Sequence, residues 1–162
     1  MPSFGEFAKT SGLNFLPDGI PITGILGDQQ SALFGQGGIS KGDLKCTYGT
    51  GAFAVVNTGE EIRYSENGLL TTVAYQYNGE TVYAIEGSSY IAGAAVQWLR
   101  DNLKIINSAP EIEELSKNIS NLEEMKNICF YPYFTGIGSP HWRSEAKASI
   151  VGISRDTNKS HI

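Results

Sequence analysis

The sequence predicts an α/β fold in which a mixed β-sheet is flanked by helices. The first half reads as a strand, a short helix and then several strands joined by tight turns, whereas the second half alternates helices with short strands. The chain has 162 residues, of which 41% are apolar, and this is enough for one core of ordinary domain size. We therefore expect a single α/β domain.

Charge and cysteine usage exclude several classes of function. The net charge is −5, and no block of Lys or Arg is present that could neutralise nucleic-acid or lipid phosphates. Cys46 and Cys129 lie far apart without the spacing of a zinc site or a disulfide framework. No apolar run approaches the roughly 20 residues of a membrane span. These features favour a globular protein of the reducing cytoplasm.

The chain begins with a segment of little predicted structure. Residues 2–19 are polar and interrupted by Gly and Pro, so we expect them to be mostly irregular. Ile20 to Leu26 reads as a buried strand, and Gln29 to Gly35 as a short helix that ends at Gly37 and Gly38. Asp28 stands at the junction of strand and helix, where an N-cap role would by itself explain a carboxylate.

A tight Gly49-Thr50-Gly51 turn joins the next two expected strands, Lys45 to Tyr48 and Phe53 to Val56. Two glycines around a threonine let a ligand approach the backbone, and outward N–H groups and one hydroxyl could cradle phosphate oxygens. Most turns of this kind only close hairpins. The turn is also not a Walker A loop, because no Gly-Lys-Ser/Thr follows.

A hairpin and a helix are expected next. Thr71 to Tyr77 and Thr81 to Ile85 are strand-like, and Asn78-Gly79 between them is typical of a type I′ turn. Apolar residues then recur at helical spacing from Ile91 to Leu103, with Ser88 or Ser89 available as a cap.

Gly93 interrupts this predicted helix, so we expect another backbone or a ligand to pack closely against it. Gln97 lies one turn further along the same face. Tight helix packing beside a solvated glutamine would explain both residues without any ligand.

The remainder carries weaker signals. Glu111 to Asn127 predicts one or two amphipathic helices, and Ile128 to Tyr131 and Ser149 to Ile153 predict short strands. A glycine-rich loop over residues 134–142 contains His141, and a lone loop histidine is more often structural, so we assign it no role.

Six motifs occur together in one order: Gly27–Gly35, Thr47–Phe53, Asn57–Gly59, Glu66–Thr72, Glu86-Gly87 and Gly93–Arg100. From about Pro21 to Ile162 they resemble the FGGY family of carbohydrate kinases, in its glycerol-phosphorylating branch. The resemblance implies a ribonuclease H-like domain of the actin and hexokinase type. It also implies that residues 1–19 belong to an inter-domain segment and residues 20–162 to a C-terminal domain that is incomplete at its own C-terminus. Arg143-Ser144 departs from the family pattern after Trp142.

The resemblance further implies ATP-dependent phosphorylation of glycerol to sn-glycerol 3-phosphate. Asp28 would be the catalytic base, Gln29 a hydrogen-bond partner of a neighbouring hydroxyl, and Phe53 an apolar wall against the carbon chain. The residues that would bind ATP are Gly49, Thr50, Gly51, Gly93 and Gln97. Mg²⁺ would accompany ATP, with its protein ligands expected outside this chain.

The implied partners are glycerol, ATP and the missing N-terminal half of the kinase, and the full-length form is expected to be a homo-oligomer. Two alternatives remain open at this point. The chain could belong to an FGGY kinase for another polyol or sugar, or it could be an inactive fragment or structural module that retains kinase residues.

Overall fold

The computed structural model describes residues 2–119 and 125–162, and the chain divides into two compact units. The first unit comprises Met1–Thr47 and Phe53–Gly87, and the second comprises Tyr48–Ala52 and Ser88–Ile162. Length and composition could not reveal the division, because the second unit takes the short turn Tyr48–Ala52 from between two strands.

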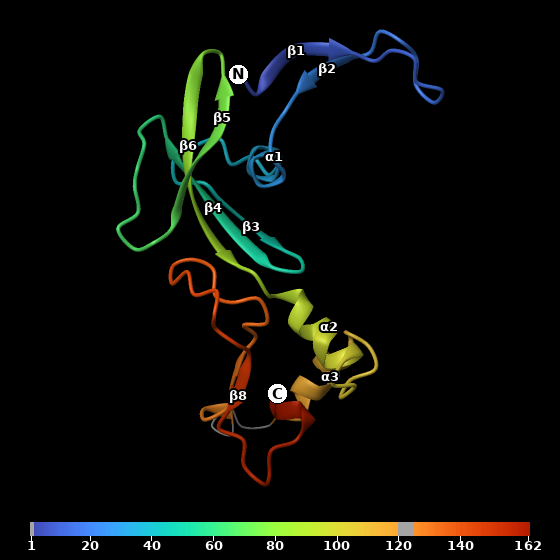
Figure 1. The fold of residues 1–162 in the computed structure, drawn as a ribbon, viewed down its shortest axis with the longest axis vertical. Coiled ribbons are helices and arrows are strands. Elements are labelled where there is room, and N and C mark those ends of the chain that lie inside the picture. The colour runs from blue at the N-terminus through green and yellow to red at the C-terminus, as the bar shows by residue number, and fades with distance from the viewer. Residues whose placement is uncertain (1, 120–124) are drawn as a thin grey trace. The chain divides into compact units, whose positions relative to one another are not determined.

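A four-stranded sheet forms most of the first unit (Figure 1). Its strands are β3 (Leu44–Tyr48), β4 (Ala52–Gly59), β5 (Leu70–Tyr77) and β6 (Glu80–Ser89), in the order β3-β4-β6-β5. β5 and β6 pair antiparallel, with Tyr77 opposite Glu80. Asn78 and Gly79 between them have φ angles of 50° and 85°, as a type I′ turn requires, so the predicted hairpin is confirmed.

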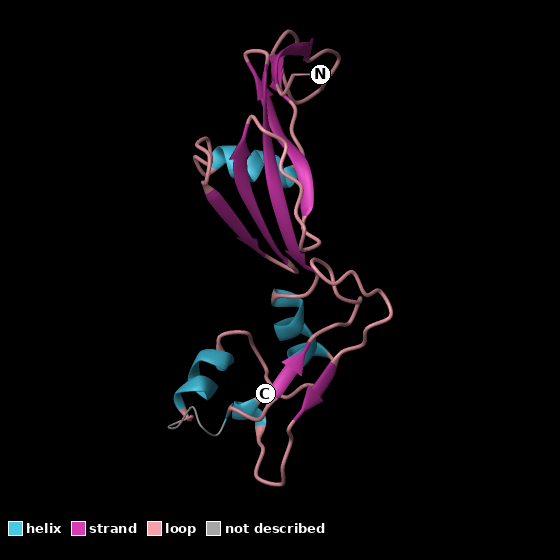
Figure 2. Ribbon diagram, turned by 90° about the vertical axis from the view of Figure 1, so that its left-hand side faces the viewer, coloured by secondary structure: helices cyan, strands magenta, loops and turns pink. Residues whose placement is uncertain are grey.

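Helix α1 (Asp28–Gly35) contributes Leu33 to the core of this unit, and Figure 2 shows the helix beside the strands. The buried core residues are Leu33, Val55, Ala74, Tyr75 and Ala84. The helix ends as predicted, because the N–H of Gly38 donates to the carbonyl of Leu33 at 2.9 Å and Gly37 has a φ of 79°.

The N-terminal segment is more ordered than its composition predicts. β1 (Phe4–Lys9) pairs antiparallel with β2 (Pro21–Gly24), so the expectation of an irregular segment is wrong for β1. β2 is exposed along its whole length, which contradicts the expected buried strand. A two-stranded ribbon leaves its apolar residues without a second layer, and Ile22 is 43% exposed for this reason. Phe4 ties the ribbon to the unit through its ring contact with Phe34, at 4.8 Å between centroids.

The second unit contains helices α2 (Gly93–Asp101) and α3 (Glu111–Lys117), strands β7 (Cys129–Tyr131) and β8 (Ser149–Val151), and a 3₁₀ turn η2 (Lys159–His161). β7 and β8 pair antiparallel, which confirms both predicted strands. The ring of Trp98 packs against Phe134 at 4.8 Å and Phe130 at 5.9 Å between centroids. Aromatic contacts therefore hold α2 against the segment around β7.

Helix α3 begins at a clamp formed by Glu111. The carboxylate accepts hydrogen bonds from the backbone N–H of Asn107 at 2.8 Å and from Nζ of Lys159 at 2.9 Å. These bonds, the backbone N–H of Asn107 first, lower the pKa of Glu111 to about 2. The amphipathic helix predicted over Glu111 to Asn127 is confirmed as far as Lys117, and residues 120–124 of that prediction lie outside the described residues.

Within the described ranges, no helix has both the length and the apolar character needed to cross a membrane.

Candidate active site

Asp28 is the first residue of α1 and is exposed. Gly27 is the N-cap, so the N-cap explanation of Asp28 is wrong by one position. The Asp28 carboxylate accepts the backbone N–H of Gln29 at 2.8 Å through Oδ1. A carboxylate in the first turn is also favoured by the helix dipole. Asp28 thus presents an accessible, acceptor-only group at a fixed position.

Gln29 follows directly and is half-buried. Its Nε2 lies 3.4 Å from Oδ2 of Asp28, and its Oε1 accepts a hydrogen bond from Nζ of Lys45. The side-chain amide is therefore held at both ends, by a carboxylate on one side and a cation on the other.

Lys45 joins the three residues expected to bind the acceptor. It lies on β3, where alternation turns Lys45 and Thr47 inward, and the residue is only 5% exposed. Besides Gln29, Nζ donates to Oγ1 of Thr47 at 2.8 Å and approaches the carbonyl of Phe53 at 3.5 Å. Lys45 thus contacts Gln29 and the Phe53 carbonyl and interacts electrostatically with Asp28, although no motif in the sequence singled it out. The available signal was one charged residue inside a strand.

The electrostatics of Lys45 reflect this burial. Desolvation lowers the pKa of Lys45 below its ordinary value, while electrostatic interactions with Glu86 first, and then with Cys46 and Asp28, act in the opposite direction. A buried ammonium is tolerable only when its donors have partners, and here oxygen atoms of three residues supply them.

The residues expected to bind nucleotide gather in the second unit. The carbonyl of Gly49 accepts the N–H of Gly93 at 2.9 Å, and the carbonyl of Thr50 accepts the N–H groups of Ala92 at 2.7 Å and Ala94 at 3.2 Å. The turn thereby satisfies amides at the start of α2 that would otherwise lack partners. The Gly49 amide donates to the Gly51 carbonyl at 2.8 Å, so the expectation that it points outward is wrong for this one group.

Gly93 is the first residue of α2, so the prediction that it lies inside a helix capped by Ser88 or Ser89 is wrong. Ser88 and Ser89 instead end β6, and Ala92 is the N-cap. A Cβ built on Gly93 would lie 2.7 Å from the carbonyl oxygen of Gly49, so close backbone packing explains this glycine.

Gln97 lies one turn beyond Gly93 on the same face of α2. Both residues are exposed. The face of α2 that carries Gly93 and Gln97 is therefore open to a ligand.

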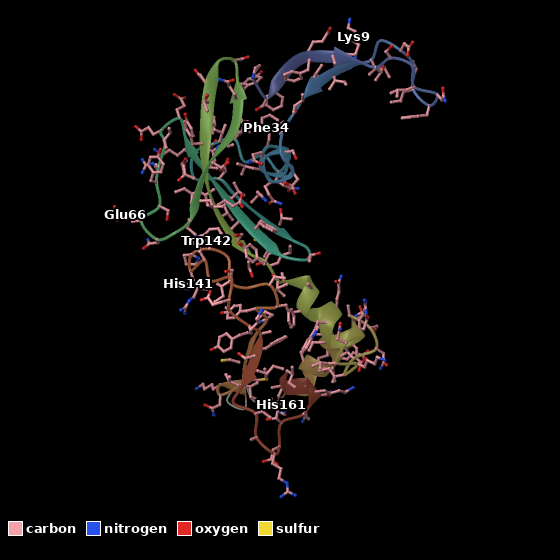
Figure 3. The ribbon with its side chains drawn as sticks, in the orientation of Figure 1. Lys9, Phe34, Glu66, His141, Trp142 and His161 are labelled. Atoms are coloured by element: carbon pink, nitrogen blue, oxygen red, sulfur yellow. The ribbon has the colours of Figure 1, made fainter. Side chains whose placement is uncertain are left out.

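The glycine-rich loop also belongs to the second unit, and His141 lies on it (Figure 3). A Cβ on Gly136 would meet the carbonyl oxygen of Arg143 at 2.8 Å. The backbone N–H of Arg143 donates to the carbonyl of Ile137 at 3.1 Å. Arg143 and Ser144, which differ from the family pattern, thus lie where backbone contacts stabilise the loop. Both side chains are exposed.

Acidic, histidine and cysteine side chains do not gather into a metal site in the described ranges: no group of three or more could hold an ion there.

Solved structures define the class of protein to which this fold belongs. A xylulose kinase from Rhodospirillum rubrum matches with a TM-score of 0.72 at 20% identity, covering 99% of this chain and 32% of the other. A Plasmodium falciparum glycerol kinase with ADP matches with a TM-score of 0.81 at 41% identity, with the same coverage of both chains. The fold is that of the carbohydrate kinases, which is the ribonuclease H-like architecture predicted from the sequence.

Residues 44–162 match the C-terminal domain of the FGGY family of carbohydrate kinases, and the chain belongs to this family. It is 49% identical over 162 residues to a glycerol kinase of Bdellovibrio bacteriovorus, and 51% identical over 158 residues to one of Myxococcus xanthus. The two matches cover 99% and 96% of this chain but only 32% and 31% of those relatives. The chain thus spans about a third of the length of the curated relatives it matches.

Proposed function

We propose that this chain is part of an ATP-dependent kinase that phosphorylates glycerol to sn-glycerol 3-phosphate and releases ADP. The identity to glycerol kinases, 49% over 162 residues, is the observation that supports glycerol as the acceptor. The FGGY kinase for xylulose named above shares the fold at only 20% identity, which favours glycerol over a longer sugar.

On the acceptor side, Asp28 is the general base. Its exposed carboxylate takes the proton of the glycerol hydroxyl as that oxygen attacks the γ-phosphate. Gln29 binds the neighbouring hydroxyl, and the Phe53 ring lies against the carbon chain. Fixing two hydroxyl groups of a small triol holds the attacking oxygen in line, and such positioning is a large part of phosphoryl-transfer catalysis.

On the nucleotide side, the turn Gly49–Gly51 binds the ATP phosphates and the open face of Gly93 and Gln97 binds the rest of the nucleotide. The hydrogen bonds between the turn and α2 support this assignment, because they fix the phosphate-binding backbone relative to the nucleotide-binding helix. Thr50 is exposed at the turn and adds a hydroxyl donor.

Mg²⁺ enters the proposal only as the companion of ATP. The described residues do not bring three or more acidic, histidine or cysteine side chains together, and we assign the protein ligands of the metal to the rest of the enzyme. We extend the proposal to a cytoplasmic, homo-oligomeric enzyme, and the free thiols of Cys46 and Cys129 suit a reducing compartment.

The test is an ADP-release assay on the full-length kinase that contains this chain, with glycerol, ribitol and xylulose as acceptors. We expect kcat/KM for glycerol to exceed the others by at least about tenfold, the effect of losing one acceptor-specific interaction. Preference for another acceptor would support an FGGY kinase of different specificity. Absence of turnover with every acceptor would support a structural module.

A further inference from the structure

We propose that Lys45 is a positioning residue of the acceptor site, where its buried ammonium fixes the orientation of the Gln29 amide and thereby selects acceptors with a hydroxyl beside the one phosphorylated. This inference rests on the proposed function. It adds a residue that contacts no substrate in the mechanism above.

The first step is the cost of placing a lysine at this point. Lys45 is 5% exposed, and an unpaired ammonium at such a site would be strongly unfavourable. Lys45 supplies three donors, and its acceptors are Oε1 of Gln29, Oγ1 of Thr47 and the carbonyl oxygen of Phe53. The Phe53 contact is to a backbone carbonyl, so Gln29 is the one side chain of the proposed acceptor site that the ammonium binds.

The second step is the direction of the Gln29 amide. An ammonium only donates, so the amide must turn its oxygen toward Lys45 and its nitrogen away from it. The nitrogen then lies 3.4 Å from Oδ2 of Asp28, which can only accept. Gln29 therefore presents N–H donors beside the catalytic carboxylate, and it recognises an oxygen with a free lone pair, such as a second hydroxyl.

The third step separates this role from simple charge balance. Glu86 is the strongest of the negative groups that act on Lys45. If Lys45 only neutralised Glu86, replacing it would lower stability and would affect all acceptors equally. If it acts through Gln29, its loss would matter only for acceptors that carry the neighbouring hydroxyl.

The experiment compares Lys45→Met, Gln29→Ala and the double variant in the full-length kinase. Met keeps the length of the side chain and removes the charge. The acceptors are glycerol and 1,3-propanediol, which lacks the central hydroxyl. We expect Lys45→Met to raise the KM for glycerol about tenfold, the loss of one charge-assisted hydrogen bond, and to leave the KM for ATP within about twofold. The preference for glycerol over 1,3-propanediol should fall by a similar factor.

The double variant should be no worse than Gln29→Ala alone, because both changes remove one interaction. Lys41→Met is the matched control, since Lys41 is an exposed lysine of the same unit, and it should behave as wild type.

Additive effects of the two substitutions on the KM for glycerol, or an equal loss of activity with glycerol and with 1,3-propanediol, would overturn the inference. If Lys45→Met does not fold, Thr47→Val decides, because it removes one acceptor of the same ammonium and keeps the charge. A raised KM for glycerol in Thr47→Val supports the positioning role, and an unchanged KM contradicts it. Wild-type enzyme without glycerol phosphorylation would instead refute the proposed function.

Discussion

Asp28 offers the most direct test at the residue scale. The backbone N of Gln29 lies 2.8 Å from Oδ1 of Asp28. Asp28→Asn keeps an oxygen that can accept this hydrogen bond, but an amide cannot accept the proton of the substrate. We expect the folded full-length enzyme to lose about 10²–10⁴-fold in kcat, the usual cost of removing a general base. The measurement is steady-state kinetics together with a thermal melting curve.

Asp101→Asn provides the matched control for this variant. Asp101 is also an exposed helical aspartate, and it forms a surface ion pair with Arg100 at 2.7 Å. Its replacement should leave kcat near wild type. A kcat close to wild type in Asp28→Asn as well would mean that Asp28 serves only the start of the helix.

The candidate residues of the site could be named from the sequence, but their surroundings could not. Asp28 and Gln29 sit in a recognisable motif at a strand-to-helix junction. Lys45 belongs to a different element, and its proposed role follows from its burial and from its hydrogen bonds to Gln29 and the Phe53 carbonyl. Burial of a charged side chain depends on which elements pack together, and no local pattern encodes that.

At the element scale, the contact between the Gly49–Gly51 turn and α2 predicts the effect of changing Gly93. In Gly93→Ala the new Cβ would stand 2.7 Å from the Gly49 carbonyl oxygen, so the turn or the helix start must shift. We expect weaker ATP binding and a lower melting temperature, measured by calorimetry on the full-length enzyme.

Gly35→Ala is the control for this shift, because a Cβ at Gly35 would have no neighbour within 4 Å. It should bind ATP normally. Unchanged ATP affinity in Gly93→Ala would separate this helix face from the nucleotide site.

The Glu111 clamp predicts a pH-dependent contribution to stability. Its pKa is about 2 in the folded chain against an ordinary value of 4.5, so the stabilisation is complete above pH 4.5 and is lost as the pH falls through 2. Glu111→Gln should therefore lower the urea midpoint at pH 7, and the difference from wild type should shrink between these two pH values.

Glu113→Gln is the matched control for the clamp. Glu113 lies on the same helix, and its ion pair with Lys117 at 3.1 Å is exposed, with 79% of the Glu113 side chain accessible. Exposed pairs of this kind contribute little. An equal shift in both variants would show that the Glu111 contacts are not specific.

Prediction of elements succeeded where the local signal was strong. The hairpin β5–β6 follows from alternation and Asn78-Gly79, and the strands around the Gly49–Gly51 turn follow from β-branched and aromatic residues. β1 was missed because Gly5, with a φ of 146°, lies inside it and reads as a breaker in the sequence. The start of α2 was placed too early because Gly93 meets a partner, Gly49, that is distant in sequence.

At the scale of the whole molecule, the division into two units follows the division of the proposed chemistry. The residues assigned to the acceptor, Asp28, Gln29 and Phe53, belong to the first unit. Those assigned to nucleotide, in the Gly49–Gly51 turn and on α2, belong to the second. The boundary between residues 19 and 20 stays a prediction, although β1 and β2 pair across it.

The coverage of relatives predicts the behaviour of the chain by itself. It matches 32% of a Bdellovibrio bacteriovorus glycerol kinase, and phosphoryl transfer in the proposed enzyme needs a closed site that excludes water and aligns both substrates. We expect the isolated 162-residue chain to form little or no glycerol 3-phosphate from glycerol, ATP and Mg²⁺, after circular dichroism has shown that it is folded. Because the chain contains the residues that we assign to glycerol and to ATP, an inactive yet folded chain would show that further residues are required for catalysis. Turnover within about tenfold of the full-length enzyme, a barrier difference of only about 1.4 kcal/mol, would mean that these two groups of residues suffice.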